Sequence, residues 1–253
     1  MLKIINWILN FFKLKLILPE KRIVPFDVEE EFVEIHKLAQ PNSMVSPERL
    51  YATYQAIQYV EANKIEGDVV ECGVWKGGNS MVMALALLNC DSRHRNIYLY
   101  DTFEGMVEPG EKDVDFKGQH SRGVWQKHQS SEVNEWCYSP LEEVKQNMAS
   151  TSYPGELMHF IKGKVEDTIP ATLPNKIAVL RLDTDWYEST AHELEHLFPR
   201  LSERGVLLID DYGHWKGQKE AVDAYFADKY IPLLSRTDYS GRMMIKLIDP
   251  EKE

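Results

Sequence analysis

The stretch DVVECGVWKGGNS, which runs from Asp68 to Ser80, determines the fold class of this chain. Residues 68–72 form a short apolar run that predicts a buried strand, and residues 79–89 predict a helix. Between them lies a turn with three glycines, Gly73, Gly77 and Gly78. A glycine-rich turn that leads from a strand into a helix lets a ligand approach the backbone N–H groups at the helix start. This stretch therefore predicts a ligand-binding α/β domain.

Around this stretch, strand-like and helix-like segments alternate along the chain. Further strands are predicted at residues 96–100, 157–161, 177–182 and 206–209, with a closing hairpin at residues 233–236 and 243–248. Helices are predicted at residues 27–38, 46–63, 139–148, 187–201 and 218–229. The alternation predicts an α/β fold with a seven-stranded, mostly parallel sheet, a C-terminal antiparallel hairpin, helices on both faces and extra N-terminal helices. Ligands of such sheets bind beyond the carboxyl ends of the strands.

The composition is typical of a soluble globular protein and excludes some classes of function. The chain has 253 residues, and its 29 basic and 40 acidic side chains give a formal net charge of −11. An acidic chain lacks the basic footprint of a non-specific nucleic-acid binder, so no nucleic-acid partner is expected. The three cysteines, Cys72, Cys90 and Cys137, are too widely spaced for a disulfide framework or a zinc ribbon. Reduced thiols in a cytoplasmic protein are the simpler interpretation.

Residues 1–18, MLKIINWILNFFKLKLIL, differ from the rest of the chain because they are basic and largely apolar. Polar residues recur every three or four positions, which predicts a helix with a narrow polar stripe. No small-residue cleavage site follows, so a signal peptide is not indicated, and the stretch is marginal for a membrane span. Two interpretations remain: a helix on an anionic membrane surface, or a helix that packs on the protein or across a dimer. We therefore divide the chain into N-terminal helices, residues 1–40, and a ligand-binding domain, residues 41–253.

Acidic residues at the ends of the first two strands favour a nucleoside ligand with a cationic group. The turn has the spacing Gly73-x-x-x-Gly77-Gly78, which does not match the dinucleotide pattern G-x-G-x-x-G. Glu71 just before it disfavours a pyrophosphate and suits the amino group of S-adenosylmethionine. Asp101, 28 residues after Gly73, is placed to accept both ribose hydroxyls. The structural alternatives are a tight turn that needs glycine and an acid exposed to solvent.

Three further acids follow the fourth and fifth predicted strands: Asp183, Asp210 and Asp211. If these strands are neighbours, the carboxylates converge and repel one another unless a cation is present. Aspartate oxygens suit Mg²⁺, which would lower the pKa of a bound hydroxyl, and a nearby aspartate could then take the proton. The structural alternative is that some of these acids cap the following helices.

Residues 192–196, HELEH, match the zinc-protease pattern H-E-x-x-H, but we interpret the match as coincidental. With Leu194 at the centre of the apolar face, steps of ~100° place His192 and His196 each about 160° away, toward solvent. A catalytic zinc would need both histidines in a cleft together with a third ligand.

The segment 104–138 has no clear period and could cover the site. Trp125, Trp136 and Tyr138 within it could stack on a sugar, or they could form local core. His214, Trp215 and Lys216, after the acid pair, could contact an acceptor or form an ordinary loop.

Four blocks of this sequence resemble the macrocin O-methyltransferase family. They are ECGVWKGG at residues 71–78, DTFEG at 101–105, LRLDTDWYEST at 180–190 and DDYG at 210–213. The resemblance extends from about residue 41 to residue 246. It implies a Rossmann-like class I methyltransferase fold that uses S-adenosylmethionine and Mg²⁺. It also implies transfer to a sugar hydroxyl, in a homodimer or higher oligomer.

Carried over from the family pattern, the site residues fall into three groups. The residues implied for the methyl donor are Met44, Val45, Glu71, Gly73, Val74, Trp75, Gly77, Gly78, Asp101, Phe103, Val165 and Glu166. Asp183, Asp210 and Asp211 are implied for the metal, with Asp183 also the candidate base. The helix 1–18 and the segment 104–138 do not follow the pattern, so no acceptor contacts are carried over.

The resulting expectation is a Mg²⁺-dependent O-methyltransferase that acts on a sugar or a glycosylated metabolite. Surface polysaccharide and natural-product synthesis are both compatible contexts, in the cytoplasm or at the inner face of a membrane. A non-catalytic glycan-binding protein and an NAD-dependent oxidoreductase are the alternatives.

Overall fold

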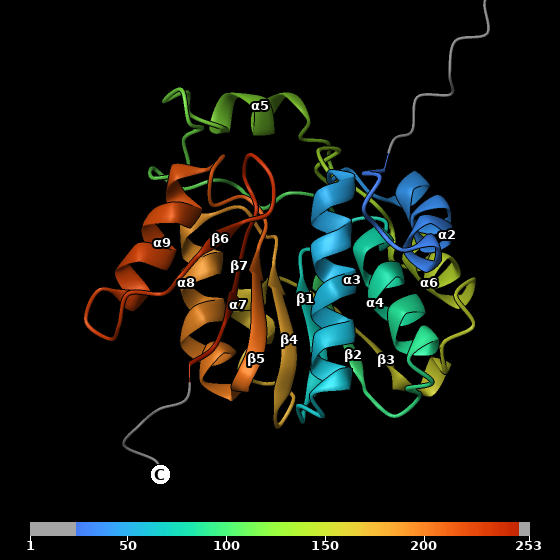
Figure 1. Ribbon diagram of the computed structural model, residues 1–253. Coiled ribbons are helices and arrows are strands. Elements are labelled where there is room, and N and C mark those ends of the chain that lie inside the picture. Colours follow the sequence, from blue (N-terminus) through green and yellow to red (C-terminus); the bar gives the residue numbers. More distant parts are fainter. Residues whose placement is uncertain (1–23, 248–253) are drawn as a thin grey trace, which may run out of the picture.

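The computed structural model describes residues 24–247 and contains one seven-stranded sheet (Figure 1). Its strand order is β3-β2-β1-β4-β5-β7-β6. The strands are β1 (Asp68–Cys72), β2 (Ile97–Asp101), β3 (Met158–Lys162), β4 (Ile177–Leu182), β5 (Leu201–Ile209), β6 (Ser235–Arg236) and β7 (Arg242–Ile245). The first five pair in parallel, and β7 pairs antiparallel with both β5 and β6. This confirms the predicted mostly parallel sheet with its closing hairpin.

Helices cover both faces of the sheet, as predicted (Figure 1). One face carries α2 (Glu30–Ala39), α3 (Pro47–Ala62), α4 (Gly78–Asn89) and α6 (Leu141–Ala149). The other face carries α7 (Val165–Thr168), α8 (Tyr187–His196) and α9 (Lys216–Phe226). Successive strand side chains point to opposite faces, so Val69 joins the core under α3 and α4 while Val70 joins the core under α8.

Several boundaries differ from the sequence prediction. The helix predicted at residues 187–201 ends at His196, and a 3₁₀ turn, η3 (Phe198–Arg200), leads directly into β5. Pro199 lies in that turn, and a proline has no N–H with which to continue a helix. The strand β5 therefore begins at Leu201 and is longer than the predicted run 206–209. Two further 3₁₀ turns are η1 (Gln40–Asn42) and η2 (Gly155–Leu157).

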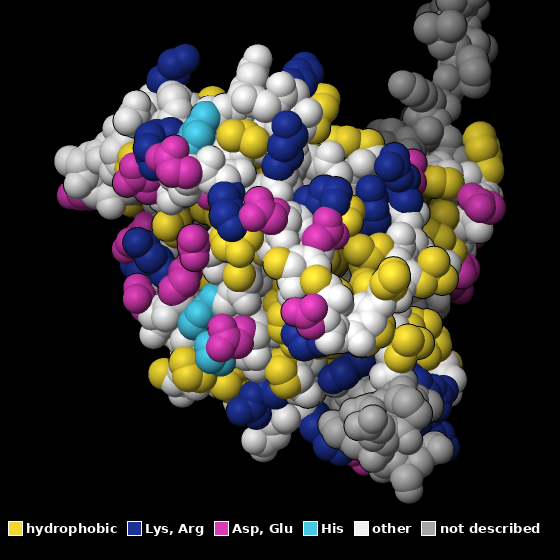
Figure 2. All heavy atoms as spheres, turned by 90° about the vertical axis from the view of Figure 1, so that its left-hand side faces the viewer, with side chains coloured by type: hydrophobic (Ala, Val, Ile, Leu, Met, Phe, Trp, Pro, Cys, Tyr) yellow, Lys and Arg dark blue, Asp and Glu magenta, His cyan; other side chains and the backbone are white. Residues whose placement is uncertain are grey.

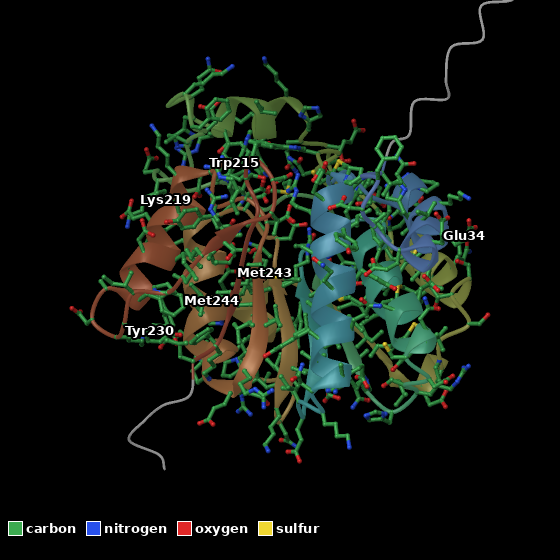
Figure 3. All side chains as sticks on the ribbon, viewed as in Figure 1. Glu34, Trp215, Lys219, Tyr230, Met243 and Met244 are labelled. Carbon is green, nitrogen blue, oxygen red and sulfur yellow. The ribbon has the colours of Figure 1, made fainter. Side chains whose placement is uncertain are left out.

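The segment without clear periodicity, residues 104–138, contains one short helix, α5 (Arg122–Lys127). Figure 1 shows α5 above one end of the sheet, and Figure 3 shows Trp215 near that same end, with Met243 and Met244 on β7 farther away. The helix predicted at residues 1–18 lies outside the described residues. Among residues 24–247, no helix is both long and apolar enough to cross a membrane.

Candidate functional site

A cleft opens at the carboxyl ends of the parallel strands, where ligands of this architecture bind. Thirteen residues implied by the family pattern line it: Met44, Val45, Glu71, Gly73, Val74, Trp75, Gly78, Asp101, Val165, Glu166, Asp183, Asp210 and Asp211. Two others do not. Phe103 is buried in the core, and Gly77 precedes α4 in a left-handed conformation, with φ of 86°.

The turn after β1 is shaped by close backbone approaches. Gly73 has a φ of +82°, and a Cβ atom there would overlap the carbonyl group of Asp183 at the end of β4. A Cβ atom on Gly78 would collide with the backbone of Asn42. These glycines allow the first turn to lie directly against the end of β4 on one side and against residues 42–46, which we call the cleft cover, on the other.

Asp101, at the end of β2, holds the glycine-rich turn in place. Its Oδ2 accepts hydrogen bonds from the N–H groups of Val74 (2.7 Å) and Trp75 (3.0 Å), and its Oδ1 accepts one from Phe103 N–H (2.7 Å). Burial raises the pKa of Asp101, and these backbone hydrogen bonds oppose the increase. The carboxylate therefore stays fixed at the cleft wall, where it was expected to meet a ribose.

Arg181 is a buried cation at the centre of the sheet. It lies in β4 directly beside Glu71 of β1 and is 3% exposed. Its Nη1 lies 2.5 Å from Glu71 Oε1 and 2.8 Å from Asp183 Oδ2, and its Nη2 pairs with Asp210. Buried charges are tolerated when they are paired, and here one guanidinium orients three carboxylates of the cleft.

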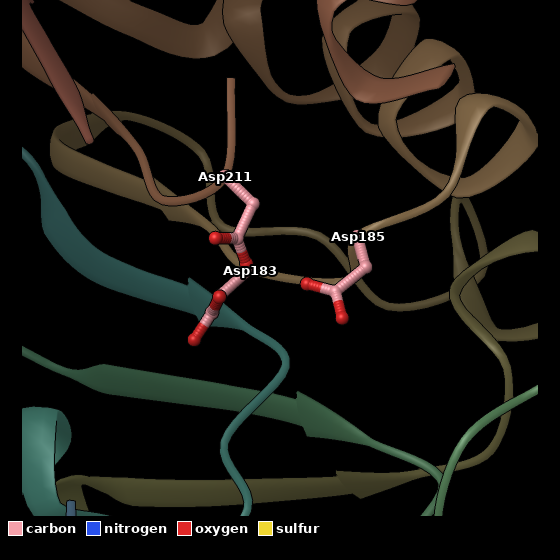
Figure 4. Close-up of side chains that lie close together, drawn as sticks. All are labelled: Asp183, Asp185 and Asp211. Atoms are coloured by element: carbon pink, nitrogen blue, oxygen red, sulfur yellow. The ribbon is translucent and has the colours of Figure 1, made fainter. Parts of the chain in front are cut away.

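Three carboxylates converge beyond β4 and β5: Asp183, Asp185 and Asp211 (Figure 4). One oxygen from each lies within 4.8 Å of the others. Burial and the neighbouring acids raise the pKa of Asp183 well above its ordinary value, although Arg181 opposes the shift. Burial and Asp211 do the same to the pKa of Asp185. A cluster of this kind fits a hard divalent cation, whose charge relieves the repulsion between the oxygens.

The structure places Asp210 differently from the expected metal set. Its two oxygens pair with Arg181 on one side and with Arg49 on the other. Asp185, not Asp210, completes the cluster with Asp183 and Asp211. Both Asp210 oxygens therefore have cationic partners already, and Asp210 links Arg49 and Arg181 beside the acidic cluster.

The cleft cover leads into α3 as the sequence predicted. The Ser46 side chain accepts a hydrogen bond from Arg49 N–H at 3.2 Å, and Pro47 occupies the first helical position. Four residues before this cap, Asn42, Ser43, Met44 and Val45, line the cleft.

The segment 104–138 is anchored across the cleft by Asp113, which is fully buried. Asp113 accepts hydrogen bonds from the N–H groups of Tyr187 (2.8 Å) and Gly110 (2.7 Å). The Trp186 indole donates to the carbonyl oxygen of Val107 at 2.9 Å. These contacts tie the segment to the start of α8, beside the acidic cluster.

Aromatic rings meet beneath this segment. Trp136 and Trp215 pack edge-on against Trp186, with ring centroids 5.8 and 5.0 Å away, and His214 lies 4.6 Å from Trp215. Trp186 lines the cleft, whereas Trp136 and Trp215 do not. The Trp125 indole donates to Met106, so this ring has a local structural role.

The H-E-x-x-H residues differ in one respect from the prediction. His192 and His196 are half-buried instead of facing solvent, and His192 Nε2 lies 2.9 Å from the carbonyl oxygen of Ile169. Glu193 between them is completely buried and accepts a hydrogen bond from Thr184 at 2.8 Å. Within residues 24–247, the acidic cluster is the only group of three side chains suited to a metal, so no zinc site forms around these histidines.

Sequence reasoning missed Arg49, Arg181 and Asp185 as site residues. Arg181 carries a recognisable signal, because a charged residue inside the apolar run VLRL needs a buried partner. Asp185 follows Asp183 by two residues, and its left-handed backbone, with φ of 69°, turns it back toward its neighbour. Arg49 has no comparable signal, since its partners are distant in sequence.

On the face seen in Figure 2, described basic and acidic side chains are interspersed and form no continuous basic patch.

Comparisons with known proteins find consistent relatives. The family profile described as Macrocin-O-methyltransferase (TylF) matches residues 25–243. A demethyldecarbamoylnovobiocin O-methyltransferase from Streptomyces niveus is 33% identical over 189 residues, which cover 75% of this chain and 69% of that protein. An 8-demethyl-8-(2,3-dimethoxy-alpha-L-rhamnosyl)-tetracenomycin-C 4'-O-methyltransferase from Streptomyces olivaceus is 36% identical over 171 residues, 68% of this chain and 62% of that protein. The match therefore spans about two thirds of each relative's length.

A solved structure shares the whole architecture. The O-methyltransferase NovP superposes with a TM-score of 0.72 and 29% sequence identity, over 89% of this chain and 91% of that chain.

Proposed function

Because the chain belongs to the macrocin O-methyltransferase (TylF) family, we propose that it methylates a hydroxyl group of a sugar or glycosylated metabolite. The enzyme class, an S-adenosylmethionine-dependent O-methyltransferase, follows from the family and the fold. The acceptor, the metal and the role of each residue are our proposals. The observation that supports them most is the convergence of Asp183, Asp185 and Asp211 beside the glycine-rich turn.

The proposed donor site lies between the glycine-rich turn and the cleft cover. Glu71 and Asp101 offer buried acids at the ends of β1 and β2, which suit the amino group and the ribose of the donor. Gly73 and Gly78 leave room for the backbone to approach it, and Val165 and Glu166, which line the cleft at the start of α7, are the residues we propose for the adenine. Gly77 and Phe103 act only indirectly, by shaping this turn and the strand end.

We propose Mg²⁺ as the metal, held by Asp183, Asp211 and a third acid. The donor set fits, because all the candidate ligands are aspartate oxygens. Sequence reasoning gave Asp210 as the third ligand, and the geometry favours Asp185, since both Asp210 oxygens are paired with arginines. When bound, the ion would lower the pKa of the acceptor hydroxyl.

In the proposed reaction, the methyl group passes from the donor sulfonium to the acceptor oxygen, and the hydroxyl proton passes to the chain. Asp183 is the proposed proton acceptor, because it lines the cleft and belongs to the acidic cluster at which the acceptor hydroxyl would bind. The cleft contributes chiefly by aligning oxygen, methyl carbon and sulfur, since the charge of the donor is lost in the transfer.

A sugar acceptor is supported by the name of the tetracenomycin relative, which includes a rhamnosyl group, and by Trp186, the tryptophan that lines the cleft. Tryptophan faces stack well on the apolar faces of sugars. We further propose a homodimer or higher oligomer in the cytoplasm. Contact of residues 1–18 with the inner face of a membrane would suit an acceptor on a lipid carrier.

The first test is calorimetric titration of the purified protein with S-adenosylhomocysteine, with and without Mg²⁺. We expect micromolar binding, and methyl transfer from labelled S-adenosylmethionine to members of a sugar panel. Asp211→Asn should lower turnover by a factor of about 100 or more, while S-adenosylhomocysteine affinity changes less than threefold. Asp185→Asn should weaken Mg²⁺ binding more than Asp210→Asn does.

Three outcomes would contradict this proposal. A protein that binds no S-adenosylhomocysteine under either condition is not using this donor, and binding of NAD instead would favour an oxidoreductase. Glycan binding without methyl transfer would favour the non-catalytic alternative. A larger loss of Mg²⁺ affinity in Asp210→Asn than in Asp185→Asn would restore Asp210 as the metal ligand.

A further inference from the structure

The turn between β6 and β7 lies at the edge of the sheet and packs against Arg49, which lines the cleft. Asp238 in this turn uses both carboxylate oxygens. Its Oδ1 accepts hydrogen bonds from the N–H groups of Ser240 (3.0 Å) and Gly241 (2.7 Å), which fix the turn itself. Its Oδ2 accepts a hydrogen bond from Ser46 Oγ (2.8 Å) and lies 2.9 Å from Arg49 Nε. One carboxylate thus contacts the N-cap of α3, Ser46, and a residue of its first turn, Arg49.

Arg49 carries the contact onward to the acids of the cleft. Its Nη1 pairs with Asp210 and lies 3.7 Å from Asp211 Oδ1. The guanidinium is nearly buried, with a side-chain exposure of 12%. A Cβ atom on Gly241 would lie 2.9 Å from Arg49 Cδ, so the hairpin turn packs directly against the arginine stem. Arg49 is therefore held from one side by the turn and presents its other side to the acids.

Ser46 carries a second contact, toward the cleft cover. Its hydroxyl donates to Asp238 and accepts from Arg49 N–H, so the same side chain caps α3 and binds the turn. The cover segment it ends contacts Gly78 at the start of α4 and lines the proposed donor pocket. The position of the cover thus depends on where the hairpin turn lies.

We propose that Asp238 is a positioning residue that holds both parts of the site: the acids Asp210 and Asp211, beside and within the proposed metal cluster, through Arg49, and the cleft cover through Ser46. We call the link through Arg49 the metal half of the proposal and the link through Ser46 the cover half. The metal half rests on the Mg²⁺ site of the proposed function, and the cover half rests only on the methyl donor of that function. Asp238 does not line the cleft, so it acts through these two partners.

The chemistry of Arg49 explains why the linkage needs an arginine. Its guanidinium spans two acids at the same time: Nε lies 2.9 Å from Asp238 Oδ2 as a charge contact without hydrogen-bond geometry, and Nη1 pairs with Asp210, whereas a lysine offers one point charge. Burial alone would raise the pKa of Asp238, but the Gly241 hydrogen bond and the Arg49 charge lower it on balance. Asp238 is thus an anion that can pair with Arg49 at neutral pH.

Three variants separate the two halves in the full-length protein. Arg49→Lys keeps the charge and loses the guanidinium, so we expect Mg²⁺ affinity to fall by about 10–100-fold, as for other residues that orient metal ligands, with S-adenosylhomocysteine affinity within threefold of wild type. Ser46→Ala should show the reverse pattern, with S-adenosylhomocysteine affinity reduced about five- to tenfold and Mg²⁺ affinity retained. Asp238→Asn should weaken both ligands.

The measurement is calorimetric titration with MgCl₂ alone and with S-adenosylhomocysteine alone, together with thermal melting to confirm folding. Glu66→Gln, which removes an exposed ion pair with Lys176, is the matched control and should leave both affinities unchanged. The proposal is wrong if Asp238→Asn binds both ligands as the wild type does. Wild-type affinity for Mg²⁺ in Arg49→Lys, or for S-adenosylhomocysteine in Ser46→Ala, overturns the corresponding half.

If the wild type itself binds no Mg²⁺, the metal site of the proposed function fails together with the metal half of the inference. The titrations with S-adenosylhomocysteine still test the cover half. If Asp238→Asn does not fold, the two single-contact variants decide the proposal.

Discussion

Arg181 determines the electrostatics of the site at the scale of single residues. It is enclosed by the sheet and pairs with Glu71, Asp183 and Asp210. Removing one partner from a buried charge network leaves an uncompensated charge, which typically destabilises a protein by about 3–5 kcal/mol. Several of the acids in the cleft are thus oriented by the fold before any ligand arrives.

Glu193 is a buried acid without a cationic partner among its described contacts, and its effect on stability can be measured. Burial raises the pKa of Glu193 well above its ordinary value, so the fold retains a proton that the unfolded chain releases above a pKa of about 4.3. The free energy of unfolding therefore falls as pH rises from about 4.3 toward the folded-state pKa, by at most ~1.4 kcal/mol per pH unit.

Glu193→Gln should remove this pH dependence and keep the acceptor for Thr184. We expect the variant to melt at a higher temperature than the wild type at pH 7, with the difference shrinking as pH falls to about 4.3. Thermal melting across pH 4–8 measures it, and Glu195→Gln, at an exposed position of the same helix, is the control. A Glu193→Gln protein less stable than wild type at pH 7 would show that the carboxylate itself is stabilising.

Individual side chains were the least predictable part of the molecule. The acids after β4 and β5 could be placed together because neighbouring parallel strands end at one edge. The pairing of Asp210 with two arginines could not, because it depends on Arg49, which is 161 residues away in sequence. The burial of Glu193 could not be predicted either, because glutamate is a polar residue and only the packing of the folded chain buries this side chain.

At the scale of elements, the contact between the glycine-rich turn and the end of β4 decides the shape of the cleft. Gly73→Ala would add a Cβ atom where the Asp183 carbonyl lies, at a left-handed backbone position. We expect a loss of more than about 2 kcal/mol in the free energy of unfolding and weaker S-adenosylhomocysteine binding.

Gly123→Ala is the matched control for this substitution. Gly123 lies in α5 with nothing within 4 Å of an added Cβ atom, so alanine there should be neutral or stabilising by up to ~1 kcal/mol. Denaturant unfolding of both variants makes the comparison. Equal stability of the two would show that the turn can move away from β4.

Elements with a strong local pattern were predicted closely. The Ser46 cap, the strand 68–72 and the helix from residue 79 match the structure to within one residue. The predicted end of α8, at residue 201, was wrong. The apolar face continues through Phe198 and Leu201, but Pro199 cannot continue the helix. The segment 104–138 gave no pattern because distant contacts such as Asp113 with Tyr187 hold it, not local periodicity.

At the scale of the whole molecule, the basic apolar stretch 1–18 suggests where the protein works. We expect the full-length chain to bind vesicles that contain anionic lipids, and a chain without residues 1–18 to bind them at least tenfold more weakly. Co-sedimentation with anionic and neutral vesicles measures this. Equal binding by both chains would leave the packing interpretation, which gel filtration of the two chains then tests through their oligomeric state.

The overall architecture followed from the sequence because alternation of strands and helices permits few topologies. Right-handed crossovers and the closing hairpin restrict the topologies, but the strand order, with β4 beside β5, was left open by the sequence and is seen only in the structure. The tryptophan cluster beside the cleft did not follow, since its rings come from three separate segments whose meeting point only the folded chain defines.

The hydrogen bond between Ser46 and Asp238 joins residues that lie 192 positions apart. Contacts of such long range form late in folding, because a large loop must close before they can be made. During synthesis the first five strands can emerge and collapse while the turn at residue 238 is still inside the ribosome. The protein would then begin to bind its ligands only when the last strand has formed, so that an unfinished polypeptide binds neither the methyl donor nor the metal.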